Sequence, residues 1–128
     1  MADDLGEAQQ WLKRARTTLV AVQSLLEHGL YDDAVSRAYY AMLYAVRALL
    51  VQDGFNVSGK HSAVVAAFGR EYAKTGKIDP RYHQMLIQDF EWRQKADYDV
   101  FWSADEADVL QRQQDAQDLI ELITQRLA

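Results

Sequence analysis

Apolar residues recur at intervals of three and four along almost the whole sequence, and this spacing limits the fold more than any other feature. The first stretch that shows it contains Ala8, Trp11, Leu12, Ala15, Leu19, Val22, Leu25 and Leu26. Residues spaced in this way share one face of an α-helix. No stretch alternates apolar and polar residues as a half-buried strand would. The pattern therefore predicts an all-α protein.

Cap and stop signals divide the chain into four to five helices. Gly29 is expected just after the end of the first helix, and the pair Asp79–Pro80 is typical of an N-cap followed by the first helical position. Ser103, followed three residues later by Glu106, predicts a capping box for the last helix. The expected helices cover about 8–28, 31–53, 61–74, 80–98 and 104–127. Because the connections are short, we expect an up-and-down bundle.

Length and composition indicate one globular domain over residues 1–128. Apolar residues make up 49% of the chain and charged residues 26%, which is typical of soluble domains. The first ten residues are polar and acidic, unlike a signal peptide, and no apolar run approaches the ~20 residues of a membrane span. The protein is therefore expected in the cytoplasm, away from membranes. The absence of cysteine fits a reducing compartment and excludes thiolate metal sites.

The second expected helix has two different sides. One side is a narrow stripe of Ala34, Ala38, Ala41, Ala45 and Ala48, which would let another helix approach closely. The opposite side carries Ser36, Tyr40, Leu43 and Arg47. Because this helix is apolar around most of its circumference, we expect it at the centre of the bundle.

The polar residues of this helix, Ser36, Arg37, Tyr40, Tyr44 and Arg47, fit three hypotheses. They form a groove that binds phosphate through hydroxyl and guanidinium groups, or an ordinary surface with snorkelling side chains, or a homodimer face. The formal net charge of −5 argues against a broad basic surface for nucleic acid but leaves room for a small basic cleft.

Arg93 is a second candidate for a site residue. Asp97 follows it by four positions and Asp89 precedes it by four, which is the spacing of helical ion pairs. Leu86 and Phe90 lie on the same side of the helix as Arg93, which indicates partial burial. Two interpretations stay open: an ordinary chain of ion pairs, or a functional arginine fixed by a carboxylate one turn away, beside the hydroxyl of Tyr98.

The histidines, at positions 28, 61 and 83, do not have the spacing of a metal site, and we expect no metal and no cofactor. Lys60 and His61 open the third expected helix, where a phosphate would be favoured by the helix N-terminus. The alternative is that His61 only forms a hydrogen bond across a helix junction. The glycine-rich and nucleophile motifs of common nucleotide-binding and hydrolase folds are absent.

Three segments resemble the HEPN domain family: AVSRAYYAMLYAVRALL, GKHSAVVAAF and RQKADY, in this order. The resemblance covers about residues 8–125 and is greatest to small stand-alone members that end this last motif as R-x-x-x-D-Y. It implies a bundle of four or five helices, often assembled as a homodimer. Stand-alone members are often paired with a minimal nucleotidyltransferase in toxin–antitoxin systems.

The resemblance also implies a function. Many HEPN proteins are metal-independent endoribonucleases whose site is an arginine and a histidine with four to six residues between them, completed by dimerisation. Here the arginine is Arg93, and the histidine positions hold Tyr98, Asp99 and Val100. A tyrosine, with an ordinary pKa near ~10, is a poor base at neutral pH. Two hypotheses therefore remain: an endoribonuclease whose base comes from elsewhere, such as His61, or a non-catalytic module that binds RNA, a nucleotide or a partner protein.

Overall fold

The computed structural model describes residues 2–57 and 59–128. Over these residues it contains α-helices, one short π-helical segment and no strand: α1 (Ala2–Glu27), α2 (Tyr31–Gln52), α3 (His61–Phe68), η1 (Gly69–Ala73), α4 (Pro80–Tyr98) and α5 (Glu106–Leu127). The prediction of an all-α helical bundle is confirmed. Within the described part of the chain, no helix is long and apolar enough to cross a membrane.

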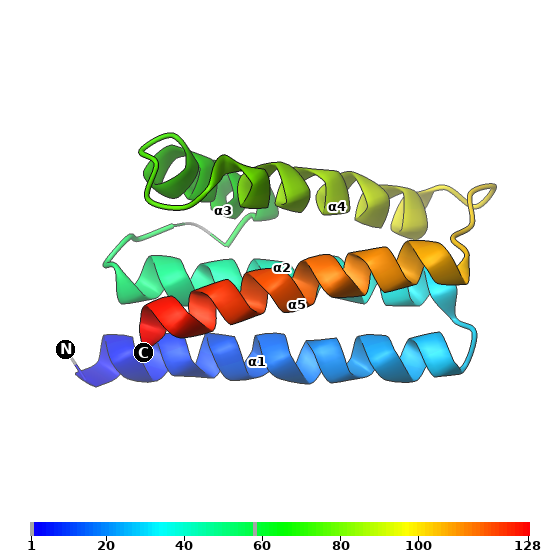
Figure 1. Cartoon of the computed structure of the whole chain (residues 1–128), viewed down its shortest axis with the longest axis horizontal. Coiled ribbons are helices and arrows are strands. Elements are labelled where there is room, and N and C mark those ends of the chain that lie inside the picture. Colours follow the sequence, from blue (N-terminus) through cyan, green and yellow to red (C-terminus); the bar gives the residue numbers. More distant parts are fainter. Residues whose placement is uncertain (1, 58) are drawn as a thin grey trace.

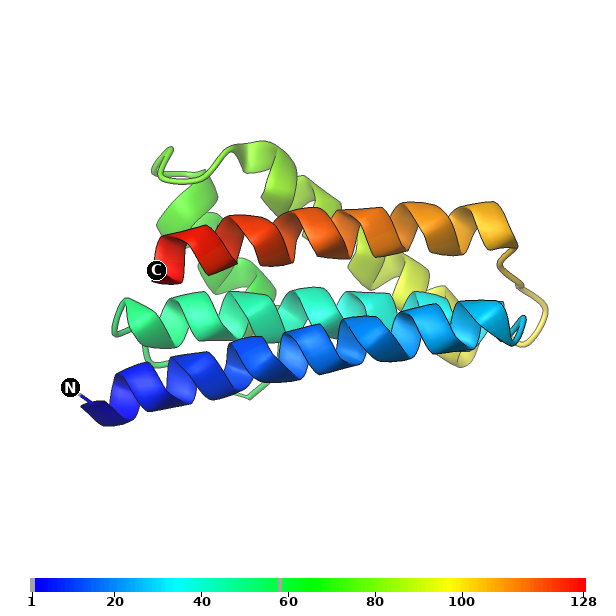
Figure 2. The same ribbon diagram turned by 60° about the horizontal axis from the view of Figure 1, so that its bottom comes forward.

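The bundle has α2 at its centre. In Figure 1, α1 lies below, α2 and α5 in the middle, and α3 and α4 above, with successive long helices running in opposite directions. Figure 2 shows α1, α2 and α5 side by side, while α4 crosses behind them at an angle. Helix α2 packs against α1, α3, α4 and α5. Its central place follows from the apolar residues around most of its circumference.

The alanine stripe of α2 is completely buried. Each of its members is 0% exposed: Ala34, Ala38, Ala41, Ala45 and Ala48. Small side chains at these positions let the neighbouring helices approach α2 closely. On the other side, Leu43 is 1% exposed and belongs to the core, so the polar side predicted for α2 is interrupted by a core residue.

Two of the predicted helix ends are confirmed and one is wrong. Gly29 has a positive φ of 71° just after α1, and Asp79 caps α4 by accepting a hydrogen bond from the backbone N of Arg81 at 3.0 Å. The cap of α5 is Asp105, which exchanges hydrogen bonds with Asp108, and not Ser103.

The later start of α5 has a physical reason. Trp102 and Ala104 pack into the small cluster at the Leu30 end of α2, and the backbone N of Ala104 donates to Asp32 Oδ1 at 2.7 Å. These contacts hold the chain in a non-helical course up to Asp105. Asp105 then forms the cap, since Asp108 lies three residues further on and completes the pair of hydrogen bonds.

The third expected helix, 61–74, has two parts, because its last turn is the π-helical segment η1. At Gly69, where η1 begins, an added Cβ would lie 2.5 Å from Cε1 of His83. The His83 ring cannot easily move aside, since its Nε2 is hydrogen-bonded to the carbonyl O of Val65 at 3.0 Å and the ring packs on Phe68.

We predict that Gly69→Ala destabilises the protein, because the new methyl group displaces the His83 ring. The expected loss is about 1–2 kcal/mol of unfolding free energy, measured by urea denaturation. Gly6→Ala in α1 is the matched control, since nothing lies within 4 Å of its added Cβ. The control is expected to be neutral or slightly stabilising; equal stability of both variants would contradict the prediction.

Candidate functional site

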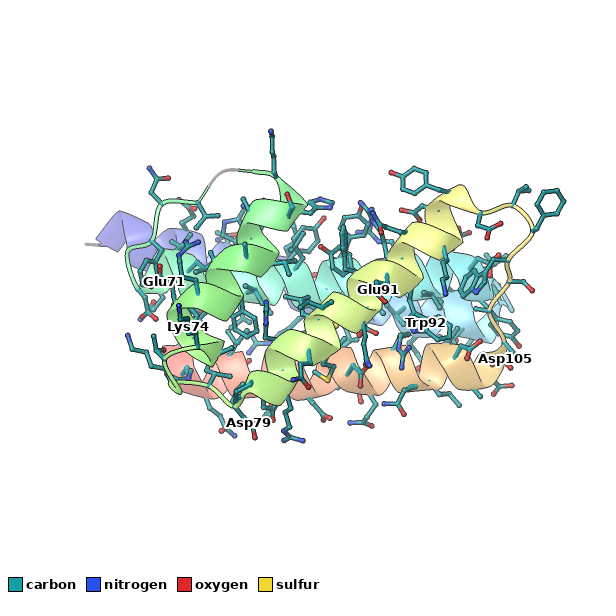
Figure 3. All side chains as sticks on the ribbon, turned by 90° about the horizontal axis from the view of Figure 1, so that it is seen from above. Glu71, Lys74, Asp79, Glu91, Trp92 and Asp105 are labelled. Carbon is teal, nitrogen blue, oxygen red and sulfur yellow. The ribbon has the colours of Figure 1, made fainter. Side chains whose placement is uncertain are left out.

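Arg93 lies where three helices meet. Figure 3 shows that α3 and α4 both cross α2 and diverge from each other. The labelled residues Glu91 and Trp92 mark the turn of α4 just before Arg93. The Arg93 Nη2 donates to the hydroxyl of Tyr40 in α2 at 3.0 Å. The same nitrogen lies 3.1 Å from Nδ1 of His61, the first residue of α3. One guanidinium group thus joins α2, α3 and α4.

The guanidinium group is nearly enclosed. Arg93 is 8% exposed, and its Nε lies 3.3 Å from Asp97 Oδ2, so the predicted i,i+4 ion pair is present. This pair does not have the geometry of a hydrogen bond, and Nε remains a buried donor without an acceptor. Four aromatic rings have their centroids 5.4–5.8 Å from Cζ: Tyr39, Tyr40, Phe90 and Tyr98. Such rings stabilise a cation from several sides.

The charge of Arg93 is maintained in this environment. Burial acts to lower its pKa, but the hydrogen bond and charge of Tyr40, and the charges of Asp97 and Tyr98, act in the opposite direction, and the net shift of the pKa is upward. Arg93 therefore stays protonated at all ordinary pH values.

His61 is held in one tautomer by Arg93. Arginine has no acceptor, so the 3.1 Å contact requires Nδ1 to accept, and the proton of the neutral ring is then on Nε2. The pKa of His61 is lowered, first by burial and then by the positive charges of Arg93 and Arg47. The ring is therefore neutral at pH 7. His61 does form a hydrogen bond across a helix junction, as one hypothesis predicted, but its partner is the candidate site arginine.

The remaining candidates on α2 lie at different distances from Arg93. Arg37 is close, since its Cζ is 4.9 Å from the Tyr40 ring centroid, and Ser36 is nearly buried at 8% exposure. Arg47 points elsewhere: its Nη2 donates to the carbonyl O of Gly59 at 2.8 Å. It supports the loop before α3, and its positive charge acts on His61.

Tyr98 and Lys60 lie at the edge of the site. The Tyr98 ring centroid is 5.8 Å from the Cζ of Arg93, yet Tyr98 is 76% exposed. Lys60 is exposed and occupies the N-cap position of α3. Both are positioned to meet a ligand that approaches from solvent.

One predicted contact is wrong. Asp89 does not complete a chain with Arg93 and Asp97, because its Oδ1 lies 2.9 Å from Nε of Arg112 in α5. Asp89 faces α5 and Arg93 faces α2 and α3.

Tyr39 belongs to the site although the sequence patterns did not predict it. This residue is 0% exposed, and its ring lies against His61 and Phe90, with centroids 6.0 and 5.5 Å away. Its hydroxyl is buried without a hydrogen-bond partner, and burial raises its pKa to about 12. The two adjacent tyrosines, at positions 39 and 40, could have indicated that Tyr39 belongs to the site, because the hydroxyl of a buried tyrosine needs polar groups nearby.

No group of three histidine, cysteine or acidic residues that would hold a metal ion occurs among residues 2–57 and 59–128. The side chains that meet around the Arg93 guanidinium group are an imidazole, phenols and one carboxylate. These are groups that bind phosphate and transfer protons.

The family model of the HEPN domain matches residues 8–127. The chain belongs to the HEPN domain family. It is 42% identical over 90 residues to a Thermotoga maritima protein named UPF0332 protein, which covers 70% of this HEPN chain and 67% of the relative. It is 38% identical over 94 residues to a Methanocaldococcus jannaschii protein named "Putative toxin MJ0142", covering 73% of this chain and 63% of the relative.

A solved structure shares the fold of this HEPN protein. The crystal structure of TT1696 from Thermus thermophilus superposes with a TM-score of 0.79, covering 93% of this chain and 97% of the other, at 18% identity. At this identity the likeness concerns the fold alone. A second Methanocaldococcus jannaschii protein, named "Putative toxin MJ0605", is 37% identical over 92 residues, covering 72% of this chain and 68% of the relative.

Proposed function

We propose that this HEPN protein is a toxin-type endoribonuclease that needs no metal, with Arg93 on the scissile phosphate and His61 as the base. The observation that carries the proposal is the 3.1 Å contact between Arg93 Nη2 and His61 Nδ1. It supplies, from the start of α3, a histidine for the arginine of α4, whereas positions 98–100 provide none. The buried Arg93 Nε, which lacks a hydrogen-bond acceptor, is a donor for a phosphate oxygen.

The proposed reaction is transesterification at the RNA 2′-OH. When a phosphate takes the place of His61 on Arg93, Nδ1 becomes free to accept the 2′-OH proton. The 2′-oxygen forms a bond to phosphorus, the bond to the 5′-oxygen breaks, and the 5′-oxygen takes a proton from Tyr98. Arg93 stabilises the charge that develops on the phosphorane oxygens. Asp97 holds Arg93, and Ser36, Arg37, Arg47 and Lys60 are proposed ligands of flanking phosphates.

The biological setting is part of the same proposal. We expect a homodimer whose two copies bring two Arg93–His61 pairs into one cleft, and pairing with a nucleotidyltransferase in a cytoplasmic toxin–antitoxin system. The two Methanocaldococcus jannaschii relatives named "Putative toxin" support the toxin part. Light scattering tests the dimer, and affinity purification from the native host tests the partner.

His61→Asn is predicted to lower RNA cleavage by ~10²–10⁴-fold, since the general base is lost. Asparagine keeps a hydrogen-bond acceptor near the position of Nδ1, so Arg93 keeps a partner, but it cannot take up a proton at neutral pH. Cleavage of a mixed RNA pool by purified protein in excess EDTA is the measurement.

The matched control is His28→Asn, because His28 is exposed just after α1 and its ring is hydrogen-bonded to the carbonyl O of Ser24, four residues earlier. This variant should cleave like the unmodified protein. Cleavage that persists in His61→Asn would remove His61 from the mechanism. Cleavage that disappears from the unmodified protein on addition of EDTA would exclude the metal-independent reaction.

A second function, phosphate or nucleotide binding without cleavage, is favoured by a different observation. Arg93 is 8% exposed and is already surrounded by Tyr40, His61 and Asp97. An arginine fixed in this way is better suited to binding a ligand than to taking part in a reaction. This hypothesis predicts that the protein does not cleave RNA. It also predicts that the protein binds a nucleotide, measured by calorimetry, or a partner protein. Arg93→Ala should abolish that binding.

A further inference from the structure

Aromatic rings continue from the Arg93 site along α2 and onto α1. The Tyr40 ring centroid lies 6.2 Å from that of Tyr44, one turn further along α2. The Tyr44 ring in turn stacks on Trp11 of α1, with centroids 5.7 Å apart and planes at 29°. All three residues are partly exposed. We call Trp11, Tyr44 and Tyr40 the aromatic strip.

Arginines lie over each ring of the aromatic strip. Their Cζ atoms are 4.9–5.6 Å from the ring centroids: Arg37 over Tyr40, Arg14 over Trp11 and Tyr44, and Arg47 over Trp11. With Arg93 at one end, the strip joins four guanidinium groups in a protein whose formal net charge is −5. Such a concentration of positive charge is unexpected on an average surface of an acidic protein, so the strip fits an anionic ligand.

At its far end the strip opens onto a hollow of about 500 Å³ on α1, beside Trp11, Lys13 and Arg14. Glu7 is the anionic group here: it lines the hollow and accepts a hydrogen bond from the indole Nε1 of Trp11 at 3.3 Å. Glu7 orients the indole. The two positive charges of Lys13 and Arg14 outweigh its single negative charge, so the hollow has a net positive charge.

Core packing alone does not explain this arrangement, because a purely structural contact between α1 and α2 would not require a guanidinium group over every ring. A single-stranded nucleic acid does require both groups, since its bases stack on aromatic faces and its phosphates bind cations. A duplex does not suit the strip, because its bases are already stacked on each other.

We infer that the aromatic strip is a stacking platform for single-stranded RNA, which leads the strand from α1 to Arg93. The inference rests on the proposed function for its ligand, and it names the form of that ligand. Trp11, Tyr44 and Tyr40 stack with successive bases, while Arg14, Arg47 and Arg37 bind the phosphates beside them.

The test measures binding separately from cleavage. Fluorescence anisotropy follows a labelled ten-nucleotide single-stranded RNA bound to the His61→Asn protein, which keeps the strip intact. Trp11→Leu, which retains apolar bulk against the core, is expected to weaken binding ~5–100-fold, the loss typical of one stacked base. The matched control is Phe101→Leu, an aromatic residue that is 96% exposed in the loop after α4 and is expected to bind normally.

Arg14→Gln gives a second and independent readout, since Arg14 is exposed and its replacement does not threaten the fold. The slope of log K against log salt is expected to become shallower by about 0.7, the value for one phosphate contact on a single strand. A duplex of the same sequence is expected to bind more weakly than the single strand.

Three results would overturn the inference: no binding of the single strand, unchanged binding and salt slope in both variants, or duplex binding at least as tight. A fourth would too: if light scattering shows that Trp11→Leu turns a dimer into a monomer, the strip is a face between copies. Strip-dependent binding without any cleavage by the unmodified protein would support the inference and refute only the proposed catalysis.

Discussion

Arg93→Ala is expected to reduce RNA cleavage by at least ~10²-fold, because the group that stabilises charge on the phosphorane is removed. Arg93→Lys should lose nearly as much. A lysine carries the charge, but it has a single nitrogen, whereas Arg93 contacts Tyr40 and His61 through Nη2 and still offers Nε to a phosphate. The measurement is the rate of cleavage of one RNA at several protein concentrations.

The matched control is Arg81→Ala, since Arg81 lies on the first turn of the same helix with its side chain 70% exposed. Its cleavage rate should be unchanged. Because Arg93 is buried, urea denaturation of each variant must show a folded protein at the assay temperature. Folded Arg93→Lys and Arg93→Ala proteins that cleave at the normal rate would refute the assignment of the site.

Local spacing was sufficient to predict what happens within one helix. Leu86 and Phe90, on the same side as Arg93, correctly indicated its burial, and Asp97 forms the ion pair expected four residues on. The apolar residues around most of the circumference of α2 correctly predicted its place at the centre. These features depend on the α-helical repeat alone, which the sequence displays directly.

Contacts between helices were not predictable in the same way. Asp89 has equal spacing to Arg93 and could have paired with it, but the rotation of α4 in the bundle turns Asp89 toward Arg112, 23 positions away. The contact between His61 and Arg93 depends on how the loop after α2 positions the start of α3. Both are set by packing angles, about which a single sequence carries little information.

Arg112→Met is predicted to destabilise the protein more than Gly69→Ala does. Arg112 Nε lies 2.9 Å from Asp89 Oδ1 and 3.5 Å from Asp115 Oδ2, and all three residues are less than a tenth exposed. The guanidinium group of Arg112 also lies over Trp92, with its Cζ 4.6 Å from the ring centroid, and Trp92 lies on the side of α4 that faces α5 (Figure 3). Methionine preserves most of this packing but leaves two buried carboxyl groups without their cation. The expected loss is about 3–5 kcal/mol at pH 9.

The loss should depend on pH, and the sign follows from Asp89. Burial, and then the charge of Asp115, raise the pKa of Asp89 to about 8 against the opposing charge of Arg112. The folded state thus holds a proton that the unfolded state releases above pH 4, so this group makes stability fall as pH rises from about 4 to 8. Without the opposing charge of Arg112 the pKa of Asp89 rises further, and the cost of ionising this buried group grows.

Urea denaturation at pH 5 and pH 9 measures this effect. At pH 5 Asp89 of Arg112→Met is protonated and carries no charge, so the loss should be clearly smaller than at pH 9. Arg70→Met is the control, because the side chain of Arg70 is 61% exposed and its ion pair with Glu71 should contribute little at either pH. Adding Asp89→Asn to Arg112→Met should recover stability at pH 9, since the variant then lacks the Asp89 carboxyl group, whose charge is costly in this buried position. An equal loss at both pH values would show that Arg112 acts through packing on Trp92 and not through its charge.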